Sequence, residues 1–261
     1  MGELIIKEDG RYKEYEGLLL ERDQLMKEAC SIHVSYVKEF GELLLESFEL
    51  KVDCIKKRKM IAFCLAAVNH GKPVDVKAMN EHIETEMAAY TTQLKDMAED
   101  KKKADEAKVC PEYKAKKCKR IYHRLAKIIH PDINPKAAEN EKIAELWNRV
   151  AIAYQCNDDV ELDNLEILIR KVLKDNGDLV AGVTIDNIDE RIDRLKEEIN
   201  EIITTEPYSW KKILSSDKKT ADLKEDIRKE IEDYKKISED LAKVLQDILS
   251  GGGVPLTWIQ E

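Results

Sequence analysis

The first third of the chain contains a long stretch with no helix breaker. Residues 13 to 69 include no proline and only two glycines. Because proline interrupts a helix and glycine weakens one, such a stretch favours a long helix, and the sequence leaves open whether that helix continues through Gly41. Its apolar residues recur at heptad spacing, as Leu18, Leu25 and Ile32 and then as Tyr36, Leu43 and Leu50. That spacing places a stripe on one helix face, as in helices that pack in pairs.

A second helix is expected to begin near Asp75. The segment 69–73, Asn-His-Gly-Lys-Pro, precedes it, and Gly and Pro just past a periodic segment are typical of a helix end. Its stripe consists of Val76, Met79, Ile83, Met87, Tyr90, Leu94 and Met97. Two striped helices joined by a short turn predict an antiparallel hairpin over residues 1–109, in which the stripes bury each other.

The rest of the chain is also predicted to be helical. Helices are expected at about 112–130, 137–156, 160–174, 186–204 and 217–250, with Pro131 and Pro135 between the first two. The segment 186–204 has apolar residues at alternating gaps of four and three, as in a coiled-coil seam. We therefore predict a second antiparallel hairpin with a short tail over residues 177–261. Pro207, Tyr208 and Trp210, in its loop, could contact a partner or plug the hairpin base, and plugging is the more common role.

Composition fits an all-α protein and argues against several classes of function. Charged residues make up 37% of the chain and aromatics 6%, which is typical of long solvated helices. The net charge of −9 argues against bulk nucleic-acid binding. The start has no apolar signal region, and no apolar run approaches the roughly 20 residues of a membrane helix. We expect a cytoplasmic protein with no membrane segment.

The cysteines give no sign of a metal site or of disulfides. There are six, and none forms a CxxC pair, so reduced thiols are expected. Cys110, Cys118, His123 and Cys156 do not have the spacing of a tetrahedral zinc site, so no metal is predicted. The sequence also has no nucleophile with a nearby base, phosphate-binding glycine loop or paired-carboxylate motif. We expect no enzyme activity and no cofactor.

One segment concentrates positive charge in this acidic chain. Between residues 113 and 130 there is no acidic residue, and the basic residues are Lys114, Lys116, Lys117, Lys119, Arg120, Arg124 and Lys127. Charge runs are most often solvated helix faces. The single sign, beside a proline-containing loop, favours a docking face for an acidic partner.

The centre of the chain resembles the second helix, loop and third helix of J-domains. The loop is His130-Pro131-Asp132, followed by Ile133-Asn134-Pro135. Residues at the positions where the family packs its core are Tyr122, Leu125 and Ala126 before the loop and Trp147, Val150, Ala153 and Tyr154 after it. The resemblance covers about residues 110 to 160 and implies a J-domain over residues 110–176.

The resemblance implies a non-enzymatic co-chaperone that recruits an Hsp70 (DnaK-type) chaperone and stimulates its ATP hydrolysis. The binding residues would be His130, Pro131, Asp132, Asn134, Lys116, Lys117, Lys119, Arg120, Arg124 and Lys127. We expect His130 and Asp132 at an exposed corner, with Asp132 accepting a hydrogen bond from a partner arginine. In the alternative interpretation Asp132 only caps the loop and His130 only packs.

Two rival functions stay open at this point. The family's usual first-helix opening is missing, and residues 94 to 107 are expected to take that helix's place. This absence motivates the first rival, a helical scaffold with a degenerate J-domain that does not activate Hsp70. The second is a nucleic-acid binder that uses the basic helix. The hairpins would contact a client protein or a second copy of the chain.

Overall fold

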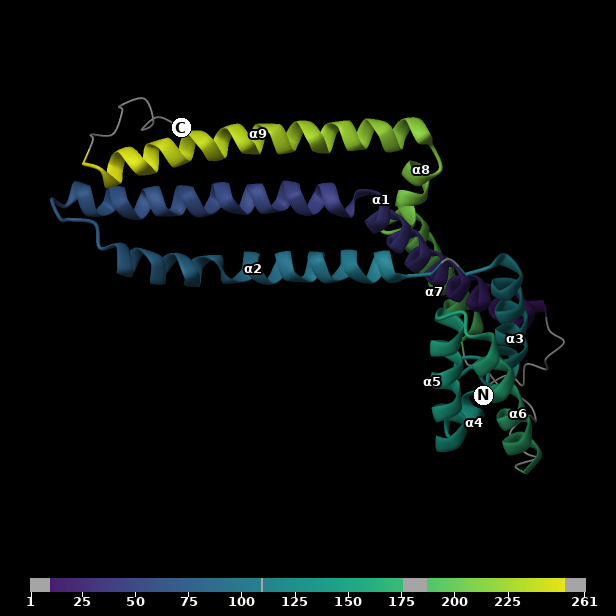
Figure 1. Cartoon of the computed structure of the whole chain (residues 1–261). Coiled ribbons are helices and arrows are strands. Elements are labelled where there is room, and N and C mark those ends of the chain that lie inside the picture. The colour runs from purple at the N-terminus through teal and green to yellow at the C-terminus, as the bar shows by residue number, and fades with distance from the viewer. Residues whose placement is uncertain (1–9, 109, 176–186, 252–261) are drawn as a thin grey trace. The chain divides into compact units, whose positions relative to one another are not determined.

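All regular secondary structure in the described part of the protein is helical. The computed structural model describes residues 10–108, 110–175 and 187–251, and none of these residues is in a strand (Figure 1). The long helices are α1 (Gly10–Asn69), α2 (Val76–Glu106), α3 (Glu112–Ile129), α5 (Glu141–Gln155), α6 (Asp159–Asp175), α7 (Ile188–Thr204) and α9 (Asp217–Leu249). The short ones are α4 (Pro135–Ala138), a 3₁₀ turn (Tyr208–Trp210) and α8 (Lys211–Leu214). The predicted all-α class is confirmed; the tail beyond residue 251 lies outside the described residues.

The chain divides into two compact units, and α1 contributes to both. Unit 1 comprises the described residues up to Ile32 and those from Lys108 to Ser209. Unit 2 comprises His33–Ala107 and the described residues from Trp210 onward. Each unit therefore combines stretches that are far apart in the sequence, because α1 supplies one packing surface to each.

Unit 2 is a layer of long helices in which α1 lies between α2 and α9 in the view of Figure 1. The turn between α1 and α2 closes at Gly71, whose φ of 62° suits glycine, and Asp75 caps α2 by accepting from the amides of Lys77 and Ala78. Ion pairs join Glu39 to Lys224 and Glu46 to Lys235, so α9 runs parallel to α1. Two apolar clusters fill this layer: Cys64, Met79, Ile83, Met87, Val244 and Ile248, and Phe40, Ile227 and Ile231.

The core of unit 1 is a bundle of α3, α5 and α6. Its buried cluster comprises Leu20, Cys118, Ile121, Tyr122, Leu125, Ala126, Ile129, Ala137, Ile143, Leu146, Val150, Ala153, Tyr154, Leu162, Leu165 and Ile169. All of these except Leu20 and Ala137 lie on α3, α5 and α6, at the three- and four-residue spacing of one helix face. We call this set of helices the bundle.

The predicted C-terminal hairpin is wrong, because α7 and α9 pack in different units. The stripe of α7 (Ile188, Ile192, Leu195) lies in a cluster with Tyr12, Tyr15 and Leu19 of α1, whereas the buried residues of α9 pack in unit 2. Ion pairs from Arg11 to Asp189 and from Arg22 to Glu198 show that α7 also runs parallel to α1. An apolar stripe indicates that a helix packs on a partner, but it does not identify that partner. Here α7 and α9 both pack on the 60-residue α1.

The aromatic residues between α7 and α9 pack within their own units. Trp210 stacks on Tyr36 with ring centroids 4.1 Å apart, and His33 lies on the same indole at 5.9 Å. The hydroxyl of Tyr208 donates to Glu28. Trp210 therefore packs on α1, and does not plug the base of the predicted hairpin, which α7 and α9 do not form.

The prediction that residues 94–107 take the place of the family's first helix is also wrong. Residues 94–107 belong to α2 and its end, in unit 2. The helix that packs beside α3 is instead the start of α1, since Leu20 enters the bundle cluster and Asp23 accepts from Tyr122. This pairing could not be predicted from the sequence, because Asp23 and Tyr122 are 99 residues apart.

Candidate functional site

The His-Pro-Asp loop connects two helices that run antiparallel. Tyr122 of α3 stacks on Tyr154 of α5 with centroids 4.0 Å apart, and His130 contacts the edge of Trp147 at 4.7 Å. Because residues later in α3 meet residues earlier in α5, the two helices form an antiparallel pair. Helix α3 ends directly before Pro131, as expected from the restriction that proline places on the residue before it.

Internal hydrogen bonds hold the loop in one shape. The amide of Asp132 donates to Nδ1 of His130 at 3.1 Å, and Asn134 donates from Nδ2 to the carbonyl of Ile128 at 2.9 Å. Asn134 also caps α4 by accepting from the amide of Ala137. Only 3% of Asn134 is exposed, so this predicted Hsp70 contact is engaged inside the loop.

His130 does not lie at an exposed corner, which corrects the expectation from the sequence. Only 4% of it is exposed, because Trp147 covers one side of the ring and Asp23 of α1 another. Its Nε2 lies 3.6 Å from Oδ2 of Asp23. Since Nδ1 accepts the amide of Asp132, the neutral ring holds its proton on Nε2, facing that carboxylate.

The other two residues of the tripeptide are only partly covered. The side chain of Asp132 is 47% exposed, and its Oδ2 lies 4.0 Å from a guanidinium nitrogen of Arg22. The hydroxyl of Tyr15 donates to the backbone carbonyl of Asp132 at 3.5 Å. Pro131 is half-buried. The tripeptide is thus contacted by α1 at two places, Tyr15 and the adjacent pair Arg22 and Asp23.

The residues predicted to form a J-domain core lie together. Tyr122, Leu125, Ala126, Val150, Ala153 and Tyr154 are buried in the bundle cluster, and Trp147 packs against it partly buried. They come from α3 and α5, the helices on either side of the loop. The same residues that suggested the resemblance therefore hold the loop's two flanking helices together.

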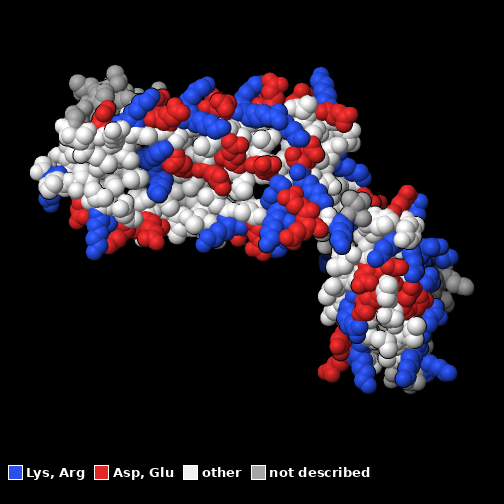
Figure 2. All heavy atoms as spheres, viewed as in Figure 1, with Lys and Arg blue, Asp and Glu red and all other residues white. Residues whose placement is uncertain are grey.

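Most of the basic residues of α3 are paired within the protein. The pairs are Lys114 with Asp159, Lys117 with Asp159 and Asp163, Arg124 with Glu166, Lys127 with Glu16, and Lys116 with Glu112. Three of them join α3 to the acidic side of α6. In the space-filling view, Lys and Arg alternate with Asp and Glu on the visible surface (Figure 2). The positive field predicted for α3 is therefore partly neutralised.

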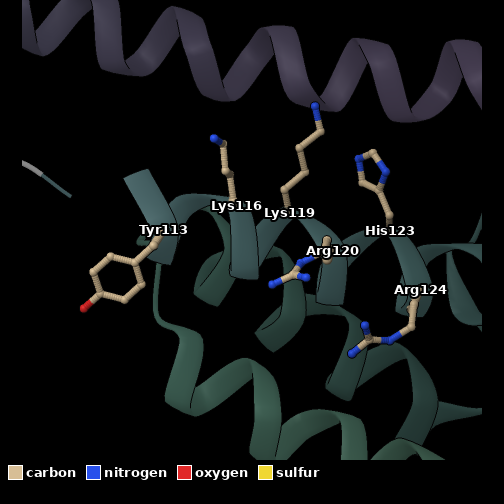
Figure 3. A pocket seen from close by; sticks show the side chains of 6 residues that line it. All are labelled: Tyr113, Lys116, Lys119, Arg120, His123 and Arg124. Atoms are coloured by element: carbon tan, nitrogen blue, oxygen red, sulfur yellow. The ribbon is translucent and has the colours of Figure 1, made fainter. Parts of the chain in front are cut away.

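Lys119 and Arg120 form the unpaired part of the basic face. Both are exposed, and among the described residues neither has an ion-pair or hydrogen-bond partner. They line a surface cavity of about 710 Å³ together with Tyr113, Lys116, His123 and Arg124, and Figure 3 shows their side chains along α3. Burial, with the neighbouring charges of Lys119 and Lys127, lowers the pKa of His123, so the cavity's positive charge comes from Lys and Arg.

The residues of α1 that contact the loop could not be identified from the sequence alone. They are Tyr15, Arg22 and Asp23, whose carboxylate lies 3.6 Å from Nε2 of His130. A partial signal is present: Glu16, Leu20, Asp23 and Lys27 recur at helical spacing, so one face of α1 is mostly charged within an apolar segment. A charged face that is buried indicates a polar interface within the protein.

Comparisons with known proteins identify no relative. A scan against models of protein families finds no match, and neither does a search of curated proteins or of solved structures. In the part of the chain that the structure describes, no helix has the length and apolarity needed to cross a membrane. Nor do the described His, Cys, Asp and Glu residues form a group of three or more that could hold a metal ion.

The carboxylate of Asp23 gives unit 1 an acid-sensitive contact. Burial alone would raise its pKa, but His130, the Tyr122 hydroxyl and Arg22 together lower that pKa below the ordinary 3.8. A lowered folded-state pKa contributes stability that is present above the unfolded pKa and is lost as pH falls through the folded one. We expect the stability difference between the native protein and Asp23→Asn to shrink as pH falls from 7 through that range.

Urea unfolding of both proteins between pH 7 and pH 3 measures this difference. Asparagine is the matched replacement because its carbonyl can still accept from Tyr122, so mainly the charge is removed. Titration of the many exposed carboxylates cancels in the comparison. A difference that stays constant over the whole range would show that the charge of Asp23 does not stabilise the fold.

Proposed function

We propose that this chain is a J-domain co-chaperone that recruits an Hsp70 (DnaK-type) chaperone and stimulates its ATP hydrolysis, without enzyme activity of its own. The protein would act through His130, Pro131 and Asp132 and through the basic face of α3. A J-domain flanked by helical segments remains part of the proposal, as does a cytoplasmic location.

The observation that supports this proposal best is the position of the tripeptide. It lies in the loop of an antiparallel pair, α3 and α5, whose contact is made by the residues that resemble the family core. The tripeptide is thereby held in a fixed conformation between two packed helices. A fixed conformation reduces the entropy lost when a partner binds.

Two parts of the site are suited to a negatively charged partner with an exposed arginine. Lys119 and Arg120 are exposed cations without an internal partner in the described structure. Asp132 has half of its side chain in solvent and can accept a charge-assisted hydrogen bond if Arg22 yields. Lys116, Lys117, Arg124 and Lys127 would first have to exchange their internal ion pairs.

Single-turnover ATP hydrolysis by the host's own Hsp70 tests the proposal. We expect the native protein to accelerate hydrolysis and Asp132→Asn to lose at least nine-tenths, roughly, of that acceleration, since it removes the acceptor charge. Asp222→Asn makes the same chemical change at an exposed position of α9 and should stimulate like the native protein. Equal stimulation by Asp132→Asn and the native protein would rule out a role for the tripeptide.

A scaffold with a degenerate J-domain is the second candidate. The observation that favours it is the burial of His130 beneath Asp23 and Trp147. If the protein never releases these contacts, the tripeptide serves only to pack unit 1. Failure to stimulate any candidate Hsp70, by the native protein and by variants with a loosened α1, would support this function instead.

Unit 2 would supply the contacts that distinguish this protein from a bare J-domain. We propose that its layer of α1, α2 and α9 binds a client protein or a second copy of the chain. The support is the length of these helices and their charged surface, where both signs alternate (Figure 2).

A further inference from the structure

We infer that the start of α1, together with α7, forms a detachable clamp over the His-Pro-Asp loop. The clamp consists of residues 10–32 and of Ile188–Thr204, both in unit 1. Hsp70 can reach the tripeptide only when the clamp has moved. This inference rests on the proposed function and adds to it that the closed clamp restrains the stimulation of Hsp70 by the native protein.

The clamp occupies the surface that a partner would need. Asp23 faces His130, Arg22 is the nearest cation to Asp132, and Tyr15 donates to the Asp132 carbonyl. Arg22, which donates hydrogen bonds to Asp23 and Glu198, thus lies 4.0 Å from the Asp132 carboxylate, on the side where we place a partner arginine. An Hsp70 that bound Asp132 would compete directly with Arg22.

The clamp and the bundle have separate apolar cores. The clamp's cluster comprises Tyr12, Tyr15, Leu19, Ile188, Ile192 and Leu195, and the loop adds Ile133 to it. From the clamp, Leu20 of α1 packs in the cluster of the bundle. Among these buried residues, only Leu20 and Ile133 pack in the cluster of the other part. Opening of the clamp would therefore leave most of each apolar core intact.

Several contacts between the clamp and the bundle are polar. Asp23 accepts from Tyr122 at 2.7 Å, Gln24 accepts from Tyr154 at 2.7 Å, and Glu16 pairs with Lys127. Polar groups regain hydrogen bonds with water when they separate, so such an interface opens more readily than an apolar one.

Lys27 is the clearest sign of an interface that is not a permanent core. It is only 8% exposed, and its ammonium donates to the carbonyl of Tyr154 at 2.6 Å and to Asn157 Oδ1 at 2.7 Å. No carboxylate pairs with it in the described structure, and burial lowers its pKa. Lysines are rarely this buried without an anionic partner, and opening would return the charge to water.

Two variants loosen the clamp in different ways. Leu20→Ala with Asp23→Ala removes the crossing apolar side chain and the carboxylate that faces His130. Glu16→Lys places a second positive charge opposite Lys127 at the edge of the interface and leaves the buried residues unchanged. The matched control is Leu18→Ala with Glu14→Ala, because Leu18 packs on the clamp's own cluster and Glu14 pairs with Lys196 of α7.

The experiment measures Hsp70 ATP hydrolysis at a subsaturating concentration of each full-length variant, together with amide hydrogen exchange of residues 128–137. We expect both loosened variants to exchange faster in the loop and to stimulate about tenfold more than the native protein, which corresponds to about 1.4 kcal/mol. Asp132→Asn added to a loosened variant should abolish the gain. The control should behave like the native protein, and circular dichroism verifies that each variant is helical.

The outcomes separate the clamp from the proposed function. If the loosened variants stimulate no more than the native protein while Asp132→Asn is inactive, the clamp is wrong and the co-chaperone function stands. Unchanged loop exchange in both variants would also overturn the clamp. If loop exchange accelerates and no variant stimulates Hsp70, the co-chaperone function fails, and with it the gating of Hsp70.

Discussion

Replacing Tyr154 with alanine is expected to lower the free energy of unfolding of unit 1 by about 3–5 kcal/mol, the range for truncating a large buried aromatic side chain. Tyr154 is among the largest fully buried side chains of the protein. Its ring stacks on Tyr122, and the ammonium of Lys27 lies 3.7 Å from its centroid. Alanine would remove these contacts and leave a cavity between α3, α5 and α1.

Tyr154→Phe is the matched control for this prediction. It keeps the ring and removes only the hydroxyl that donates to Gln24, so we expect a loss of about 1 kcal/mol. Urea unfolding followed by circular dichroism measures both variants. A loss below about 1 kcal/mol for Tyr154→Ala would mean that the ring is not a structural centre of unit 1.

Replacing Phe40 with alanine is expected to destabilise unit 2 by a similar amount, about 3–5 kcal/mol. Phe40 is fully buried in a cluster with Ile227 and Ile231, and so it joins α1 to α9. Tyr36 packs on the same ring with centroids 4.7 Å apart. The substitution would therefore weaken the packing between two helices whose sequences are far apart.

Phe48 provides the control within the same helix. It is half-buried and lies outside the Phe40 cluster, so Phe48→Ala should cost less than Phe40→Ala. Hydrogen exchange resolved by segment then shows whether α9 loses protection only in Phe40→Ala. Equal losses for the two variants would mean that Phe40 has no special part in joining α9 to α1.

The local structure of the protein could be predicted from its sequence. Each helix expected over residues 13–250 is present within a few residues, and Asp75, Asn134 and Pro131 mark helix ends as polar caps and prolines do. These features follow from periodicity and from backbone chemistry close to each residue. The pairing of α3 with α5 was also accessible, because a short loop brings consecutive helices together.

The sequence by itself thus determined which segments are helical, where they end and which face of each is apolar. The tertiary structure alone decided which helices share a core: α7 and α9 each pack on α1, and the start of α1 covers His130. The physical reason is that the hydrophobic effect is non-directional. An apolar stripe therefore determines which face of a helix is buried, but not which helix covers that face. The accessibility of the tripeptide depends on that choice of partner and could not be predicted from the tripeptide itself.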